Sequence, residues 1–207
     1  MPIIPSRMPL SGGVLCLDFT NTKNRNPAEG AFEFFVDYSR LLRWGLQLGL
    51  LSQSEAETLL ELAGARQGEA QAALERTTRL REAIYTVFAA VEGSQTVPAE
   101  ALALLNLAWT NAMNHLQVSL EGNKFGWKWV GMERALDGVL WPVVKSAAEL
   151  LVSENLNRVK RCNGCNWLFL DTTRDARRRW CDMKLCGNRA KARRHYDRMH
   201  SPAGAPE

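Results

Sequence analysis

Long apolar runs are missing from this 207-residue sequence. A membrane-spanning helix needs roughly 20 consecutive apolar residues, and no window of the sequence approaches that length. The first ten residues are interrupted by prolines and lack the apolar stretch of a secretory signal. We therefore expect a cytoplasmic protein that makes no membrane contact and whose thiols stay reduced.

Histidine is scarce as well, with three in the whole chain. His115 stands alone beside a predicted strand, so it has no partner for acid–base work. Asp18 and Asn21 have no histidine, serine or second carboxylate at a spacing that suggests nucleophilic catalysis. The sequence therefore disfavours an enzyme, and we predict no catalytic residues.

Cysteine is sparse too, but its spacing is informative. Four of the five cysteines form a C-x2-C-x15-C-x4-C array, namely Cys162, Cys165, Cys181 and Cys186. Four thiolates at such spacing can close a tetrahedral zinc site, so we predict one Zn2+ per chain. Cys16 lies in an apolar stretch and is expected to be a small buried hydrophobe.

Three other interpretations of the cysteines are weaker. Disulfides require an exported chain. A redox C-x-x-C expects a βαβ context and leaves Cys181 and Cys186 without a role. His195 and His200 could replace the second cysteine pair, but 29 residues separate Cys165 from His195, which disfavours them.

Acidic residues are nearly absent from the segment that holds this array. Between Arg158 and His200 there are thirteen basic residues and four acidic ones, a net charge of +9, whereas the rest of the chain sums to −5. The sequence thus predicts an acidic body, residues 1–155, and a basic tip, residues 156–207. Because a tip of this size needs a metal to fold and the body can bury a full core, we expect residues 1–155 to fold alone.

The body is predicted to be mainly helical within an α+β fold. Apolar stripes predict helices over about 31–50, from Ser52 or Ser54 to Gly64, through 80–91, over 96–113 and over 137–152. Ser52 and Ser54 are each followed three residues later by a glutamate, which is typical of a capping box. Alternating apolar residues predict a short strand over 14–19, and a two-residue loop at 122–123 predicts a β-hairpin with its large apolar side chains on one face.

Asp18 lies in that predicted strand, and Asn21 lies where the strand ends. A carboxylate in so apolar a stretch needs a partner. Either it caps neighbouring backbone N–H groups, which we favour, or both residues contact a small-molecule effector.

The tip is predicted to be a treble-clef-like finger. Cys162 and Cys165 form a zinc knuckle in which Gly164 allows the turn, and residues 167–171 and 177–181 are expected to pair as a hairpin. Cys186 precedes a terminal helix. On this helix Ala192, Tyr196 and Met199 share a face that we expect to pack on the knuckle.

The excess of cations predicts a nucleic-acid interface. The candidate residues are Arg177, Arg178, Arg179, Arg189, Lys191, Arg193, Arg194 and Arg198. If residues 177–179 form a strand, Arg177 and Arg179 point one way and Arg178 the other. DNA is favoured over RNA because the small finger core must use most of the aromatic residues that could stack on RNA bases. A protein-interaction module remains the other alternative.

The sequence resembles the CGNR zinc-finger proteins of bacteria. The likeness rests on residues 186–189 (CGNR), preceded by 178–183 (RRWCDM) and followed by 190–193 (AKAR). Residues 15–22 (LCLDFTNT) and 79–84 (RLREAI) are similar to the ABATE domain that accompanies this finger. The resemblance implies a stress-linked transcription regulator in which the four cysteines bind zinc and the finger contacts DNA. It implies no ligand or enzyme activity, and our own hypothesis is that the N-terminal domain senses a small molecule or forms a homodimer.

Overall fold

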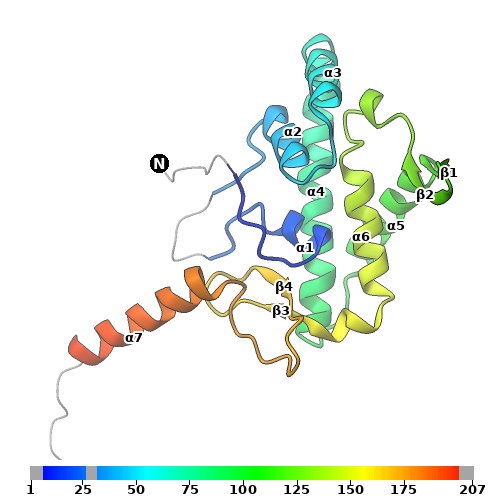
Figure 1. The fold of residues 1–207 in the computed structure, drawn as a ribbon. Helices are drawn as coiled ribbons and strands as arrows, with labels where there is room; N and C mark the ends of the chain where they lie inside the picture. Colours follow the sequence, from blue (N-terminus) through cyan, green and yellow to red (C-terminus); the bar gives the residue numbers. More distant parts are fainter. Residues whose placement is uncertain (1–6, 27–31, 201–207) are drawn as a thin grey trace, which may run out of the picture.

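The structure is a computed structural model that describes residues 7–26 and 32–200, and its fold is mainly helical (Figure 1). The helices are α1 (Leu15–Thr20), α2 (Tyr38–Gln47), α3 (Gln53–Ala65), α4 (Gln67–Glu92), α5 (Ala99–Met113), α6 (Leu140–Leu151) and α7 (Asn188–His200). The strands are β1 (Leu116–Glu121), β2 (Lys124–Trp129), β3 (Val159–Arg161) and β4 (Leu168–Leu170). Short turns of helix, η2 (Met132–Arg134), η3 (Glu154–Arg158) and η4 (Met183–Gly187), join them. None of the described helices is long and apolar enough to cross a membrane.

The helix α4 is the central element of the body, with α1, α2, α3 and α5 packed around it. The core beside it is aromatic. Phe19 of α1, Trp44 of α2 and Phe35 of the segment before α2 contact one another, with ring centroids 5.4 Å apart for Phe19 and Trp44 and 5.9 Å apart for Phe35 and Trp44. Such tilted and edge-on contacts are the arrangement that aromatic quadrupoles favour.

Most predicted helices are confirmed. At the start of α3 the Ser52 hydroxyl accepts a hydrogen bond from the Glu55 N–H, and the Glu55 carboxylate accepts one from the Ser52 N–H, which completes the capping box. The helix α4 ends one residue before Gly93, and α5 begins after Pro98. These helix ends follow from capping and helix-terminating residues that can be recognised in the sequence.

The predicted strand at residues 14–19 is wrong, because this stretch forms the helix α1. Every residue from Cys16 to Thr20 is buried, including the polar Asp18 and Thr20, so the helix has no polar face in solvent. A helix buried on all sides lacks the period of 3.6 that identifies an amphipathic helix, and six residues are too few to separate it from a strand.

The predicted helix over 31–50 is also shorter than expected. It begins at Tyr38, because the Asp37 carboxylate accepts a hydrogen bond of 3.0 Å from the Arg40 N–H and caps it there. Phe34 therefore belongs to the segment that precedes the helix, although it packs into the same core.

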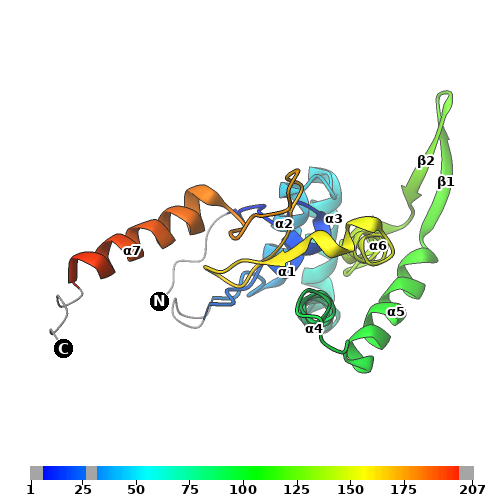
Figure 2. The same ribbon diagram turned by 90° about the horizontal axis from the view of Figure 1, so that it is seen from below.

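The β1–β2 hairpin has the predicted register, with Val118 opposite Trp127 and Leu120 opposite Phe125. Its apolar face, however, lies in solvent, with 63% of Val118, 58% of Leu120, 78% of Phe125 and 65% of Trp127 exposed. Figure 2 shows the hairpin extending away from the helices. Register was therefore set by the two-residue turn and the cross-strand pairs and not by burial against the body.

The strands of the finger complete the core of the body. β3 and β4 pair with each other and pack against α1 and α4. Leu168 and Phe169 are fully buried in the same cluster as Phe19. The independent folding of residues 1–155 stays a prediction, and this shared core is a physical reason to expect a large loss of stability on truncation.

Two side-chain hydrogen bonds fix α1 to β4. The Asn21 amide donates to the Leu168 carbonyl at 2.9 Å, and its oxygen accepts from the Leu168 N–H at 3.1 Å. Next to it the Leu170 N–H donates to the Gly12 carbonyl at 2.8 Å. Asn21 thus satisfies both backbone groups of Leu168, as a neighbouring strand would.

Replacing this amide should destabilise the protein. In Asn21→Ala the Leu168 N–H and C=O lose their partners inside the core, so we expect the free energy of unfolding to fall by about 2–4 kcal/mol. Chemical denaturation measures the change, and Asn106→Ala on the exposed face of α5 is the matched control, with no loss expected. An Asn21→Ala protein within about 0.5 kcal/mol of wild type would contradict this role.

Candidate metal centre and nucleic-acid interface

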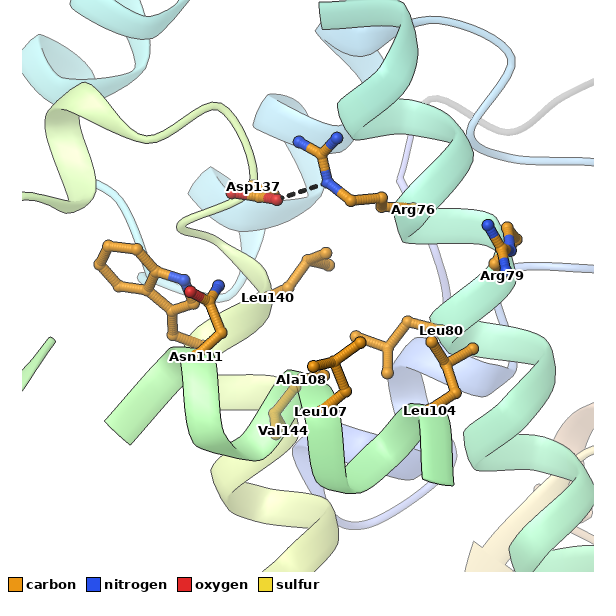
Figure 3. A pocket seen from close by; sticks show the side chains of 11 residues that line it. Arg76, Arg79, Leu80, Leu104, Leu107, Ala108, Asn111, Asp137, Leu140 and Val144 are labelled. Carbon is orange, nitrogen blue, oxygen red and sulfur yellow. Dashed lines mark hydrogen bonds and ion pairs between the residues drawn. The ribbon is translucent and has the colours of Figure 1, made fainter. Parts of the chain in front are cut away.

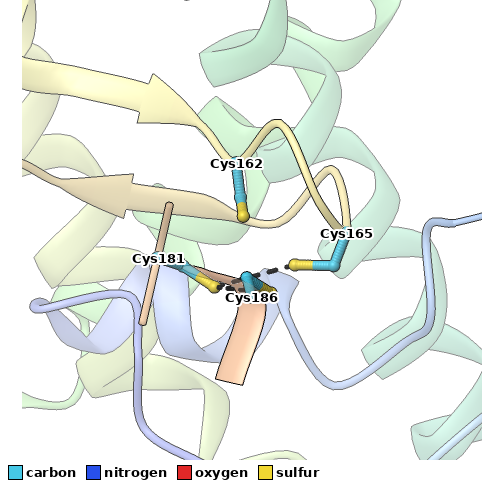
Figure 4. Close-up of side chains that lie close together, drawn as sticks. All are labelled: Cys162, Cys165, Cys181 and Cys186. Carbon is cyan, nitrogen blue, oxygen red and sulfur yellow. Dashed lines mark hydrogen bonds between the residues drawn. The ribbon is translucent and has the colours of Figure 1, made fainter. Parts of the chain in front are cut away.

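The structure brings together the four cysteines of the array (Figure 4). Their sulfur atoms lie within 4.8 Å of one another, and all four residues are buried. The Sγ atom of Cys181 is 3.6 Å from that of Cys165 and 3.8 Å from that of Cys186. Four thiols therefore converge on one point from three separate segments of the tip.

These distances fit one zinc ion. With Zn–S bonds of about 2.3 Å, tetrahedral geometry places sulfurs about 3.8 Å apart, whereas a disulfide requires about 2.05 Å. Four thiolates are also the donor set that structural zinc prefers, and they leave no open position for a reacting ligand. Cys162, Cys165, Cys181 and Cys186 would hold the ion, whose chemistry is to crosslink the tip.

The four thiols influence one another strongly. The hydrogen bond with Cys162, together with burial, raises the pKa of the Cys181 thiol, and contact with Cys162 is also the main reason that the pKa of Cys165 is raised. One thiolate is therefore tolerated here, but four require a cation to balance their charge. Cys16 stands apart: burial raises the pKa of its thiol to about 12, which makes it an unreactive core residue.

The knuckle is shaped by close packing. A Cβ atom on Gly164 would lie 3.2 Å from the Cys186 Cβ, so glycine allows the two ligand segments to approach each other. The left-handed residue of the turn is Asn166, with φ of 60°, and the Gly164 N–H donates to the Cys162 sulfur at 3.4 Å. Glycine at position 164 is therefore explained by space, and the prediction that its backbone freedom allows the turn is wrong.

The predicted hairpin between residues 167–171 and 177–181 is wrong, because β4 pairs with β3, the strand that precedes the knuckle. Residues 177–179 are instead held by Asp171, a buried carboxylate that the sequence analysis did not single out. It accepts hydrogen bonds from the Thr173 hydroxyl at 2.6 Å and from the Arg178 N–H at 2.8 Å, and pairs with Lys160 at 3.2 Å. The sequence feature that could have identified Asp171 is that it is an acidic residue in a segment with so few acids.

Burial by itself raises the pKa of Asp171, but the hydrogen bonds from Thr173 and Arg178 and the ammonium group of Lys160 outweigh it. Together they hold the pKa well below its usual range. Asp171 is therefore a carboxylate in the folded protein at neutral pH. Its charge neutralises Lys160, which removes that cation from the set available to a nucleic acid.

Asp18 and Asn21, the candidate effector residues, both lie inside the protein. The Asp18 carboxylate accepts a hydrogen bond of 2.7 Å from the Gly12 N–H, which is the capping interaction that the sequence favoured. A Cβ atom on Gly12 would lie 2.5 Å from the Asp18 backbone nitrogen, so the loop closes tightly over α1. Ligand binding at Asp18 and Asn21 stays a prediction, and neither residue lines a cavity described in the structure.

The predicted nucleic-acid contacts differ in exposure. Arg177 and Arg179 are exposed, whereas Arg178 is half-buried over the Phe169 ring, 4.9 Å from its centroid, and donates to the Cys181 carbonyl. The remaining candidates, Arg189, Lys191, Arg193, Arg194 and Arg198, are exposed on α7. Arg178 therefore supports the finger, and the others lie on its surface.

The expected packing of α7 on the knuckle is wrong. Tyr196 is 61% exposed and Met199 is 70% exposed, and α7 has no buried residue. Figures 1 and 2 both show the helix extending away from the body. Its sequence has too few apolar residues to form a buried face, so it depends on the metal-crosslinked turn before it for its position.

Comparison with protein families agrees with this architecture. Residues 13–154 match the ABATE family, described as "putative stress-induced transcription regulator", and residues 158–199 match the CGNR zinc finger. The protein therefore belongs to the class of zinc-finger regulators. More particularly, it is a member of the ABATE family that carries a CGNR zinc finger. A comparison with curated proteins gave no match.

The zinc centre predicts a definite metal content. The purified protein should contain about one zinc per chain, and Cys181→Ser should lose most of it because three thiolates hold structural zinc far more weakly. Cys16→Ser is the matched control and should keep its zinc, since Cys16 is not among the four cysteines that converge. Metal analysis gives the result. A Cys181→Ser protein with unchanged zinc would contradict the four-cysteine site.

The buried carboxyl group of Asp18 should make the free energy of unfolding depend on pH. Burial raises its pKa to about 6 in the folded protein, against an ordinary value of about 3.9, so the folded state binds the proton more tightly. This contribution to stability is complete below about pH 4 and is lost as the pH rises to about 6. The asparagine of Asp18→Asn keeps an acceptor for Gly12 and does not titrate.

The free energy of unfolding of wild type, relative to Asp18→Asn, should therefore fall on the order of 2 kcal/mol between pH 4 and pH 7. Urea denaturation of both proteins across this range measures the difference. A constant difference would show that Asp18 does not carry a raised pKa.

Proposed function

We propose that the protein is a DNA-binding transcription regulator whose finger contacts the duplex and whose N-terminal body responds to a small molecule. The observation that supports this best is the distribution of cations in the tip. The acids there are few, and the buried one already neutralises a lysine. Seven exposed cations of the predicted set, Arg177, Arg179, Arg189, Lys191, Arg193, Arg194 and Arg198, extend over one loop and one helix.

The helix α7 has the form of a groove-reading element. All of its residues except the half-buried Ala190 are exposed, and B-DNA's major groove admits one α-helix. Lys191, Arg194 and Arg198 lie on one face at i, i+3 and i+7 and border a shared hollow. Arg189 and Arg193 lie on the opposite side, so we propose the first three as the principal contacts.

The loop cations would assist this helix. Arg177 and Arg179 are exposed next to the zinc centre, and Arg179 lies over the Trp180 ring at 5.7 Å. Guanidinium groups bind phosphate or guanine edges with two parallel hydrogen bonds, so these arginines fit either role.

The alternatives receive less support. Single-stranded RNA needs exposed aromatic rings for stacking, but Trp167 and Phe169 are buried, which leaves Trp180 half-buried and Tyr196 exposed. A protein-interaction module would explain exposed charge but not so large an excess of one sign. A homodimer stays a prediction, as does a cytoplasmic location, which is where a bacterial regulator meets its DNA.

DNA binding should be strongly electrostatic. If about five cations contact phosphates, the logarithm of the binding constant should fall with the logarithm of salt concentration at a slope of roughly −4 to −5. Removing one phosphate contact in Arg179→Ala or Arg194→Ala should flatten the slope by about one on all duplexes, whereas loss of a base contact should cost about 1–3 kcal/mol on the cognate duplex alone.

Salt titrations use a duplex selected from a random pool and its scrambled counterpart. Arg43→Ala, an exposed arginine of α2, is the control and should bind like wild type. Wild-type affinity in both finger variants would contradict the proposal. Tighter binding to single-stranded RNA than to either duplex would support the RNA alternative.

A further inference from the structure

A cavity of about 440 Å3 lies between α4, α5 and α6, away from Asp18 and Asn21 (Figure 3). Its volume falls within the range of small-molecule sites, roughly 300–1,000 Å3. Aliphatic side chains form most of its wall, namely Leu80, Leu104, Leu107, Ala108, Leu140 and Val144. Such a wall suits the apolar body of an organic molecule and not a metal ion or a sugar.

The polar groups of this cavity are mainly donors. Arg76 and Arg79 project from α4, and Arg76 pairs with Asp137 at 2.7 Å (Figure 3). Within residues 7–26 and 32–200 the Arg79 guanidinium has no hydrogen-bonding or ion-pair partner. The lining therefore has two cationic side chains and one acidic side chain, which leaves one positive charge unbalanced.

A second donor is unsatisfied. Trp141 lines the cavity and is 3% exposed, and its indole N–H is buried without an acceptor among the described residues. A buried donor without a partner costs about 1–3 kcal/mol, so such groups call for an explanation. His115 stacks on the indole ring at 3.9 Å, which holds the ring in place.

We propose that this cavity binds a medium-sized organic acid. Its apolar body would lie among the leucines of α5 and α6, its carboxylate would pair with Arg79, and an acceptor atom would reach the Trp141 N–H once the side chains that cover it shift. This site rests on the proposed sensing function and deepens it, and it lies apart from Asp18 and Asn21, for which ligand binding stays a prediction.

The helix α4 connects this cavity to the finger. Arg76, Arg79 and Leu80 face the cavity, and further along the same helix the Tyr85 hydroxyl donates to the Asn166 carbonyl of the knuckle at 3.1 Å. At its end Glu92 accepts hydrogen bonds from Arg161 of β3 at 2.9 and 3.1 Å. A ligand against α4 thus contacts the helix on which the finger is mounted.

Calorimetric titration of the full-length protein tests the site. The probes are octanoate and phenylbutyrate, each paired with its uncharged alcohol, octanol and phenylbutanol. Wild type should bind each acid about tenfold more tightly than the alcohol, because the charge-assisted bond to Arg79 is made only by the carboxylate. Arg79→Gln should remove this preference and leave the alcohols unchanged, whereas Arg43→Gln should change nothing.

A second variant tests the apolar wall. Ala108→Leu fills part of the cavity and should weaken acids and alcohols alike, and a cooperative thermal transition shows that the variant folds. The proposal is overturned if wild type binds neither acid more tightly than about 1 mM, or if Arg79→Gln keeps wild-type affinity for the acids. Because these titrations contain no DNA, their failure and the failure of DNA binding are separate results.

Discussion

The structure depends on the paired hydrogen bonds between the Asn21 amide and the backbone of Leu168. This side chain takes the place of a neighbouring strand for β4, so the β3–β4 sheet of the finger is held against the buried helix α1. The same contact buries Leu168 and Phe169 in the core of the body. Body and finger are therefore physically continuous, even though two family models divide them near residue 156.

This continuity explains residues that first suggested a ligand site. Asp18 closes the Gly12 loop, and the Gly12 carbonyl in turn accepts from Leu170. Arg81 is fully buried, yet its guanidinium pairs with Glu33 and donates to the Thr22 hydroxyl at 3.2 Å. The polar residues around α1 thus satisfy one another and the incoming strand, which is what buried polar groups require. An effector is better sought where a donor is left unsatisfied, at Trp141.

The zinc site and the hydrophobic core each order a different part of the tip. The hydrophobic contacts of β3 and β4 fix the hairpin, while the segment from Asp171 to Gly187 buries few apolar side chains and is fixed by Asp171 and by the cysteines. The helix α7 follows Cys186 almost directly and buries nothing of its own. Its direction is therefore set by the metal centre, and the side chains that face a duplex are set by helical spacing alone.

The sequence by itself determined the features that rest on local chemistry: the capping box of α3, the ends of α4 and α5, the register of the β1–β2 hairpin, and the cysteine spacing of the zinc site. Family resemblance added the regulator class. Only the tertiary structure decided that residues 15–20 form a helix, since burial on every side erases the helical period. It alone decided that β4 pairs with β3, because both candidate partners, residues 159–161 (VKR) and 177–181 (RRRWC), are short and mostly basic, so the sequence pattern does not separate them. It also revealed the cavity, whose lining comes from three helices and the loop before α6, and no local pattern could predict that these surfaces leave space between them.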